Sequence, residues 1–359
     1  MQKKVKTISF KGQNIYVGID VHLKSWTVTI IVGLITHKSF SQDPSAELLA
    51  AYLCRNFPEG NYFSVYEAGF CGFSVHRQLE SNGITNLVVN PADIPTTDKE
   101  RSQKEDRRDS RKLAKSLKNG ELTGIYIMSS QQEELRSLVR YRKTTMKEIC
   151  RHKNRIKSFL YLKGIHIPKQ LNTASKYWSA SFTKWLKQLE LTTEYGHMVL
   201  NQTIETAEFL RGKLLKVNRE FRQLEKRSQY TEDLKQLRSI PGVGLIVAMT
   251  FLSELDNIKR FNNLDKLCSF VGLIPSTHSS GEKEVAANIT RRTNKPLRAA
   301  IVESSWVAIR YDPALSLKYN QLRSRMEPNQ AIIRLANNML NRIRYVLLNH
   351  KDYVCSVVE

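Results

Sequence analysis

The chain has 359 residues, of which 41% are hydrophobic, so it is long enough and apolar enough to form two or three folded domains. It carries 56 Lys and Arg against 34 Asp and Glu, a formal net charge of +22 that indicates a polyanionic partner. No apolar run reaches the length of a transmembrane helix, the N-terminus lacks the pattern of a signal peptide, and the five scattered cysteines form no zinc or disulfide pattern. Nucleic acid is therefore the expected partner, without membrane association, and a reduced cytoplasmic location is expected.

The first third of the chain predicts an α/β domain. Residues 14–32 predict two strands joined by a turn near His22 to Ser25, and residues 63–67 and 86–90 predict two more strands. Helices are expected from Pro44 to Cys54 with Asp43 as the cap, after Gly72, and from Lys104 to Lys118. This order describes strands and helices arranged around a mixed sheet.

The middle of the chain predicts two long amphipathic helices. Apolar residues recur at three- and four-residue steps from Leu135 to Leu160, and again from Ile204 to Leu224. The near-heptad spacing predicts an antiparallel hairpin, an intermolecular coiled coil or an ordinary face of a helix bundle. We expect domains at 1–128 and 231–359 with a helical oligomerisation region at 129–230.

The last third predicts a mainly α-helical domain. Pro241-Gly242-Val243-Gly244 separates two apolar helices, which predicts either a helix-hairpin-helix that holds a DNA phosphate or a plain interhelical turn. The sequence GLIPSTHSSGEK at 272–283 predicts a small-residue loop. A helix is expected to start at Asn294-Lys295-Pro296, and a last helix covers Gln330 to His350.

Four acidic residues are candidates for a metal site. Asp20 and Glu67 each end an apolar strand, and Asp106 and Asp109 lie three residues apart on one helical face. Such a cluster could hold divalent ions, since Mg²⁺ prefers oxygen ligands. For Asp106 and Asp109 the alternative is ion pairing with the Arg and Lys residues of a solvated helix.

Five segments together resemble the DEDD-type insertion-sequence transposases (the IS-one-ten family). They are YVGIDVHLKSWTVTI, YEAGFCGFSVHRQLESNGITNLVVNPADIP with KEDRRDSRKLA, LRSIPGVGLIVAMTFL, FVGLIPSTHSSGEK and ITRRTNKPLRAAIVESSW. The resemblance implies an RNase H/RuvC-like N-terminal domain and a metal-binding set of Asp20, Glu67, Asp106 and Asp109. It further implies Ser280 as a nucleophile and recombination of double-stranded DNA guided by a structured element-encoded RNA. Two residues depart from the family pattern: Glu105 stands where a small polar residue is expected, and Thr293 stands where glycine is usual before Asn294.

The expected chemistry is attack of Ser280 on a DNA phosphate beside one or two Mg²⁺ ions, with Mn²⁺ as a substitute and a covalent phosphoserine intermediate. Ser279 is the alternative nucleophile, and His278 is either a base or a structural residue. Because the carboxylates and the serine fall in different domains, we expect a homo-oligomer, a dimer or a tetramer, that shares them. Other readings are a RuvC-like nuclease that uses water, and a non-enzymatic nucleic-acid-packaging protein. The residues expected to bind nucleic acid are Lys104, Arg107, Arg108, Arg111, Gly242, Gly244, Lys283, Arg291, Arg292, Lys295 and Arg298.

Overall fold

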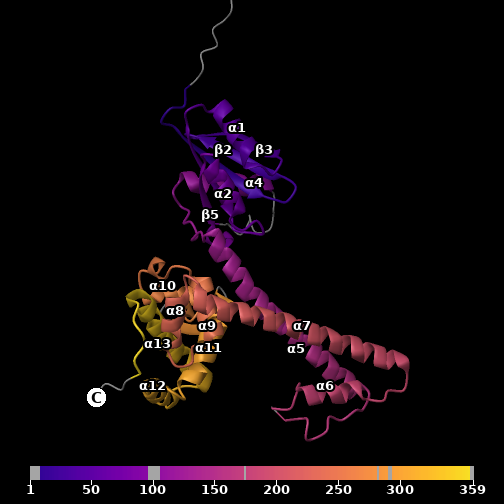
Figure 1. Cartoon of the computed structure of the whole chain (residues 1–359). Coiled ribbons are helices and arrows are strands. Elements are labelled where there is room, and N and C mark those ends of the chain that lie inside the picture. The colour runs from indigo at the N-terminus through magenta and orange to yellow at the C-terminus, as the bar shows by residue number, and fades with distance from the viewer. Residues whose placement is uncertain (1–8, 96–105, 174, 281–282, 290–292, 356–359) are drawn as a thin grey trace, which may run out of the picture. The chain divides into compact units, whose positions relative to one another are not determined.

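The structure of the protein is a computed structural model that describes residues 9–95, 106–173, 175–280, 283–289 and 293–355. The chain divides into two compact units, Met1–Met128 and Ser129–Glu359, which are taken in turn (Figure 1).

The first unit is built on a five-stranded mixed sheet in the order β3-β2-β1-β4-β5. The central strand β1 pairs antiparallel with β2 and parallel with β4, and β4 pairs parallel with β5. The strands are β1 Asn14–Val21, β2 Trp26–Val32, β3 Ile35–Gln42, β4 Asn61–Glu67 and β5 Thr85–Val89, and the helices are α1 Ala46–Asn56, α2 Ser74–Ser81, the 3₁₀ turn η1 Pro91–Asp93 and α4 Asp106–Lys118. The expected mixed α/β sheet is confirmed.

Two local predictions for this unit were wrong or incomplete. The N-cap of α1 is Ser45 rather than Asp43, because the Ser45 hydroxyl accepts a hydrogen bond from the Leu48 amide at 3.1 Å. The edge strand β3 was not predicted, since its sequence ITHKSFSQ is polar and mostly exposed and its pairing with β2 is what makes it a strand.

The two faces of the sheet carry different layers. Along β1 the side chains of Ile15, Val17 and Ile19 are fully buried in a large cluster that includes residues of α1 and α2. The opposite face packs against α4, through a smaller cluster that contains Val65 and Leu113. Alternate residues of one strand therefore separate the main core from the face that receives α4.

The second unit is mainly helical. Its elements are α5 Ser130–Leu162, α6 Ala180–Lys187, α7 Glu194–Arg227, α8 Thr231–Arg238, α9 Leu245–Leu255, η2 Ile258–Arg260, α10 Leu264–Val271, β6 Pro275–Ser280, β7 Lys283–Ile289, α11 Lys295–Ala308, α12 Pro313–Arg323 and α13 Pro328–Asn349. None of the helices in the described part of the chain is both long and apolar enough to cross a bilayer.

The long helices α5 and α7 form an antiparallel hairpin within the chain (Figure 1). Leu135 and Val139, near the start of α5, share a core cluster with Val217 and Phe221, near the end of α7. At the other end, residues of late α5 and early α7 share a second cluster with α6. The first of these clusters continues into α8–α13, so the hairpin and the C-terminal helices belong to one unit.

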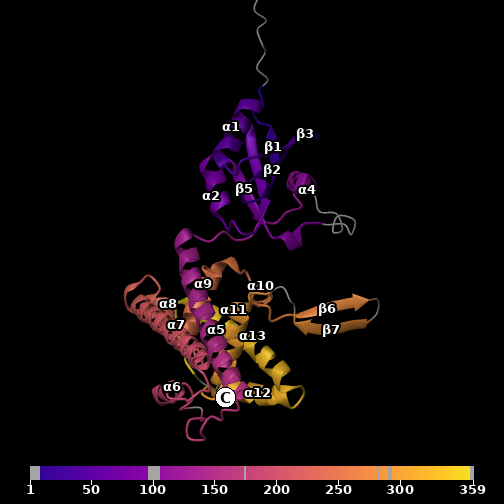
Figure 2. The same cartoon turned by 90° about the vertical axis from the view of Figure 1, so that its right-hand side faces the viewer.

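The turn before α9 and the start of α11 agree with the sequence prediction, whereas the serine segment does not. Pro241–Gly244 joins α8 to the buried helix α9, as expected for an interhelical turn, and α11 starts after the N-cap Asn294 as predicted. The segment expected to be a serine loop instead contains strand β6, which pairs antiparallel with β7 in a hairpin that extends from the helices (Figure 2). In this hairpin Ser280 pairs with Lys283. The strand was not predicted because its Ser-rich composition is typical of a loop, whereas pairing with β7 makes the segment extended.

Candidate metal centre and serine hairpin

A close approach between β1 and α4 builds the site in the first unit. Gly18 lies so near α4 that an added Cβ would be 2.0 Å from the Ser110 carbonyl oxygen and 2.5 Å from the Ala114 nitrogen. The hydroxyls of Thr29, opposite Gly18 on β2, and Ser110 share a buried 2.8 Å hydrogen bond. The helix is therefore held against the centre of the sheet at a position that only glycine permits.

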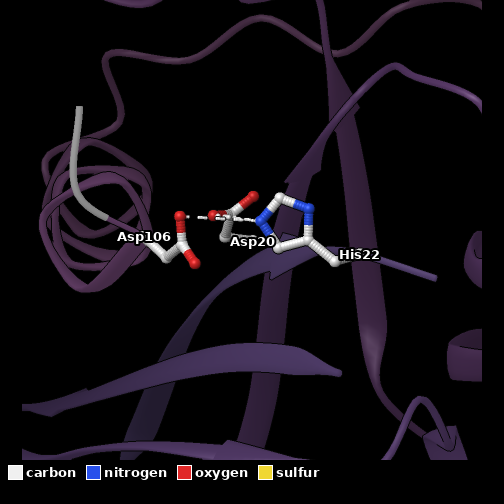
Figure 3. Close-up of side chains that lie close together, drawn as sticks. All are labelled: Asp20, His22 and Asp106. Atoms are coloured by element: carbon white, nitrogen blue, oxygen red, sulfur yellow. Dashed lines mark ion pairs between the residues drawn. The ribbon is translucent and has the colours of Figure 1, made fainter. Parts of the chain in front are cut away.

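This crossing brings the start of α4 to the end of β1. Asp106 lies one helical turn before Ser110, and Asp20 lies two residues beyond Gly18 on the same face of β1. His22 stands between them, with its Nε2 3.2 Å from Asp20 Oδ2 and 3.6 Å from Asp106 Oδ1 (Figure 3). One donor atom from each of the three residues lies within 4.8 Å of the other two.

The other two expected carboxylates fall in the same region. Ile19 pairs with Tyr66 in the parallel ladder, so the next residues, Asp20 and Glu67, follow each other at the same edge of the sheet. Asp109 lies three residues after Asp106 in the first turn of α4, where carboxylates are favoured by the helix dipole. Glu67 is exposed, as is Asp106, whereas Asp109 is half-buried.

The electrostatics of Asp20 reflect this crowding. Burial raises the pKa of Asp20 above its usual value, the neighbouring His22 lowers it, and the negative charges of Asp106 and Asp109 raise it further. Ionised Asp20 is thus partly desolvated and faces two like charges. A divalent cation would remove that repulsion, so the donor set fits a hard metal ion bound mainly through carboxylate oxygens.

His22 was not predicted from the sequence to belong to this site. Its imidazole contacts both Asp20 and Asp106 and so can orient the two carboxylates as an outer partner of a metal site. The only signal in the sequence was its position two residues after a strand-end aspartate. That signal is weak, because the partner Asp106 is remote in the chain.

The serine hairpin of the second unit is anchored where it leaves and rejoins the helices. Gly272 ends α10 in the left-handed conformation at φ 84°, and its amide donates to the Cys268 carbonyl at 2.8 Å. After the hairpin, the backbone amide of Asn294, the N-cap of α11, donates to the Phe270 carbonyl at 3.1 Å. Both ends of the hairpin segment are therefore fixed to α10.

Thr293, noted as a departure from the family pattern, lies directly against Gly272. A Cβ added to Gly272 would be 2.2 Å from the Thr293 Cβ, and the Thr293 hydroxyl is buried with no hydrogen-bond partner among the described residues. The glycine at 272 thus makes room for Thr293 at the base of the hairpin.

A buried carboxylate links this base to the helical core. Glu254 of α9 is 1% exposed and accepts two hydrogen bonds from Arg140 of α5, at 2.7 and 2.8 Å. It also accepts from the Asn294 side-chain amide at 2.9 Å, and Asn294 in turn caps α11 by accepting from the Leu297 amide at 3.2 Å. Glu254 therefore holds α5, α9 and the start of α11 together.

The residues expected to bind nucleic acid are placed as follows. Arg107, Arg111, Gly244 and Lys295 are exposed, whereas Arg108, Gly242 and Arg298 are half-buried. Gly242 has φ +86°, and a Cβ there would lie 2.3 Å from the Ser304 carbonyl oxygen, so packing against α11 explains this glycine. Lys104, Arg291 and Arg292 lie outside the described residues, as does Glu105, and only the backbone is described for Ser279, Ser280, His278 and Lys283.

Comparison with known proteins identifies the family. Residues 17–166 match a model described as "Transposase", of the DEDD IS110 type, and residues 234–320 match "Transposase IS116/IS110/IS902 family". The chain is 28% identical to "Putative transposase y4qE" of Sinorhizobium fredii, over 82% of this chain and 70% of that protein. It is 27% identical to "Putative transposase y4rJ" of the same species, over 91% and 90% of the two chains.

A similar protein from another genus is also described as a transposase. "Transposase for insertion sequence element IS1111A" of Coxiella burnetii is 25% identical, over 79% of this chain and 78% of its own length. The two matched family segments contain the carboxylate group of the first unit and the hairpin of the second. The chain therefore belongs to the IS110-type DEDD transposases, enzymes that cut and transfer the DNA of insertion sequences.

Proposed function

We propose that this transposase cuts and rejoins DNA with a RuvC-like metal centre in its first unit and Ser280 of its second unit as the nucleophile. As a DEDD transposase it binds DNA and uses divalent metal ions. The observation that carries the proposal is the convergence of Asp20 and Asp106 beside His22 at the edge of a mixed sheet. The three antiparallel strands followed by two parallel ones support an RNase H/RuvC-like assignment of that sheet.

Four carboxylates would hold the metal: Asp20, Glu67, Asp106 and Asp109. Mg²⁺ is the proposed ion, one or two per site, with Mn²⁺ as a substitute, because both prefer oxygen ligands. When bound, the ion would neutralise charge on the scissile phosphate and lower the pKa of an attacking hydroxyl. The chain's own contribution is to hold the carboxylates in position, through the packing of α4 against Gly18 and the contacts of His22.

The proposed covalent step uses Ser280, the last residue of β6. Its Oγ loses a proton and bonds to phosphorus, while the bond from phosphorus to one sugar oxygen breaks and that oxygen takes up a proton. The phosphoserine diester conserves the energy of the broken bond, so attack by another sugar hydroxyl can rejoin the strand and release Ser280. Ser279 and His278 keep the alternative roles of nucleophile and base, and the exposed Lys295 near the α11 start supports phosphate binding there.

A trapped protein–DNA adduct tests this step. End-labelled insertion-element DNA is incubated with the protein and Mg²⁺, denatured, and separated by electrophoresis to detect a label that migrates with the protein. We expect the adduct with the unmodified chain and with Ser279→Ala, and its loss with Ser280→Ala. Cleavage that persists in Ser280→Ala without any adduct would instead assign the chemistry to water, as in a RuvC-like nuclease.

Two partners are part of the proposal: a structured RNA encoded by the element, which selects the DNA sites, and a second copy of the chain. The net charge of +22 supports binding of more than one nucleic acid. Because the carboxylates and Ser280 belong to different units, a dimer or tetramer could combine them from separate chains. Mixing Asp20→Ala protein with Ser280→Ala protein should then restore cleavage, and a mixture as inactive as either variant would contradict shared sites.

A further inference from the structure

A basic cavity lies in the second unit, between the long helical hairpin and the α8–α9 turn. Its volume is about 390 Å³, and α5, α7, α8 and α9 all contribute to its lining. The polar residues that line it are Arg142, Asn218, Arg222, Glu225, Lys226 and Arg238. The first two residues of α9, Leu245 and Ile246, add an apolar wall.

The cations of this cavity outnumber the nearby carboxylates. Arg238 pairs with Glu225, which is the one acidic residue among the described residues that line the cavity. Arg142 donates from Nε to the neutral Asn218 side-chain oxygen at 2.7 Å. Among the residues that the structure describes, no carboxylate pairs with Arg142, Arg222 or Lys226. Within this described part of the chain, three positive charges of the cavity therefore remain without a counter-ion.

Keeping these charges together is unfavourable in the protein alone. Arg222 and Lys226 stand four residues apart on α7, where like charges face each other and destabilise a helix. Loss of hydration lowers the pKa of Arg142, which means that its surroundings oppose its charge. A bound anion would offset both costs, and the volume of about 390 Å³ falls in the range of roughly 300–1,000 Å³ that is typical of small-molecule sites.

The residues that line the cavity indicate which chemical class of ligand it binds. Arginine side chains are suited to bidentate contacts with phosphate oxygens, and the aliphatic surface of Leu245 and Ile246 suits the carbon skeleton of a sugar. We propose that this cavity binds a phosphodiester and its sugar from the backbone of a nucleic acid. The inference rests on the proposed function, since it assigns a contact to the nucleic acid that the transposase handles.

Salt-dependent binding of the full-length chain tests the cavity directly. Fluorescence anisotropy is measured in EDTA, so that no strand is cut, with a short labelled DNA duplex in one arm and a labelled stem-loop RNA in the other. In each arm the logarithm of the binding constant is plotted against the logarithm of the salt concentration. The test variant is Arg222→Gln with Lys226→Gln, which removes two cations from the cavity lining.

Two matched variants control for general charge and for folding. Lys216→Gln with Arg219→Gln removes the same charge from exposed positions of α7 that do not line the cavity. Arg222→Lys with Lys226→Arg keeps both charges in place. Circular dichroism and the melting temperature of each variant show whether α7 remains folded.

We expect the test variant to reduce the steepness of the salt dependence by about 0.9 on duplex DNA, or about 0.7 on RNA segments that bind as single strands, since the contact with one phosphate is lost. The charge-retaining variant should keep the original slope, and the surface control should change the slope by a smaller amount than the test variant does. The arm that shows the larger loss identifies DNA or RNA as the source of the phosphodiester. An unchanged slope in both arms, or an equal loss of slope in the surface control, overturns the proposal. Cleavage and adduct formation by the same variants are measured separately, so failure of the cavity proposal can be told apart from failure of the proposed function.

Discussion

Gly18 and the Ser110 carbonyl oxygen are so close that no side chain fits between β1 and α4: an added Cβ would lie 2.0 Å from that oxygen. The contact fixes how far α4 stands from the sheet. It thereby determines the position of Asp106 relative to Asp20, the two carboxylates that His22 contacts.

Gly18→Ala should therefore destabilise the first unit and weaken its metal binding. A methyl group forced into this contact must push α4 away, a type of overpacking that costs about 1–3 kcal/mol. Urea unfolding monitors the stability, and calorimetric titration with Mn²⁺ monitors the metal site. Gly212→Ala is the matched control, because that glycine lies in α7 with nothing within 4 Å of an added Cβ.

For the control we expect a gain of about 1 kcal/mol or less, from the higher helix propensity of alanine. Equal losses in the two variants would show that the contact with Ser110 does not limit the position of α4.

Asp20→Asn should stabilise the metal-free protein while abolishing metal-dependent stabilisation. Burial and the charges of Asp106 and Asp109 raise the pKa of Asp20, so its ionised form is disfavoured in the fold near neutral pH. The neutral amide removes that penalty. In EDTA at neutral pH the variant should melt a few degrees higher than the unmodified chain, and added Mg²⁺ should raise only the melting temperature of the unmodified chain.

The pH dependence has a defined sign. A raised carboxyl pKa means that the protonated form is favoured by folding, so the stability from Asp20 is present below its unfolded pKa and is lost as pH rises through the folded value. The advantage of Asp20→Asn in EDTA should accordingly shrink as pH falls through the folded pKa, which lies above 3.8. An advantage that grows on acidification would contradict the burial and charge effects assigned to Asp20.

Local sequence signals indicated where part of the candidate site lies. Asp20 and Glu67 each follow an apolar strand, and the parallel pairing of β1 with β4 places both residues at one edge of the sheet. The contact of Asp106 with His22 could not be predicted, because it depends on where α4 crosses Gly18 in three dimensions. The strand β6 was missed for a similar reason, since its partner β7 determines its conformation more than its own Ser-rich composition does.

Arg140→Ala should destabilise the second unit by about 2–3 kcal/mol. The substitution leaves the buried Glu254 carboxylate without its cation. Because Arg140 is half-exposed, the expected loss lies below the roughly 3–5 kcal/mol that is typical when a fully buried pair is broken. Arg151→Ala is the control on the same helix, because its pair with Glu148 is exposed and should contribute about 0.5 kcal/mol or less. Chemical denaturation followed by tryptophan fluorescence compares them, and similar losses would mean that Glu254 is not dependent on Arg140.

Gly272→Ala should disturb the base of the serine hairpin for two separable reasons. Alanine at φ 84° is strained by about 1–2 kcal/mol, and its Cβ would lie 2.2 Å from that of Thr293. Adding Thr293→Gly removes the steric conflict but leaves the backbone strain. The double variant should therefore recover part of the lost stability, with a coupling of about 1–3 kcal/mol between the two sites in a double-mutant cycle.

The same variants separate stability from the placement of the hairpin. Formation of the Ser280 adduct should fall in Gly272→Ala and return in part in the double variant, because the contact with Thr293 sets where the hairpin leaves α10. Thermal melting run in parallel identifies any loss that comes from unfolding alone. Purely additive effects in the cycle would show that Gly272 is needed for its backbone conformation and that Thr293 does not constrain the hairpin.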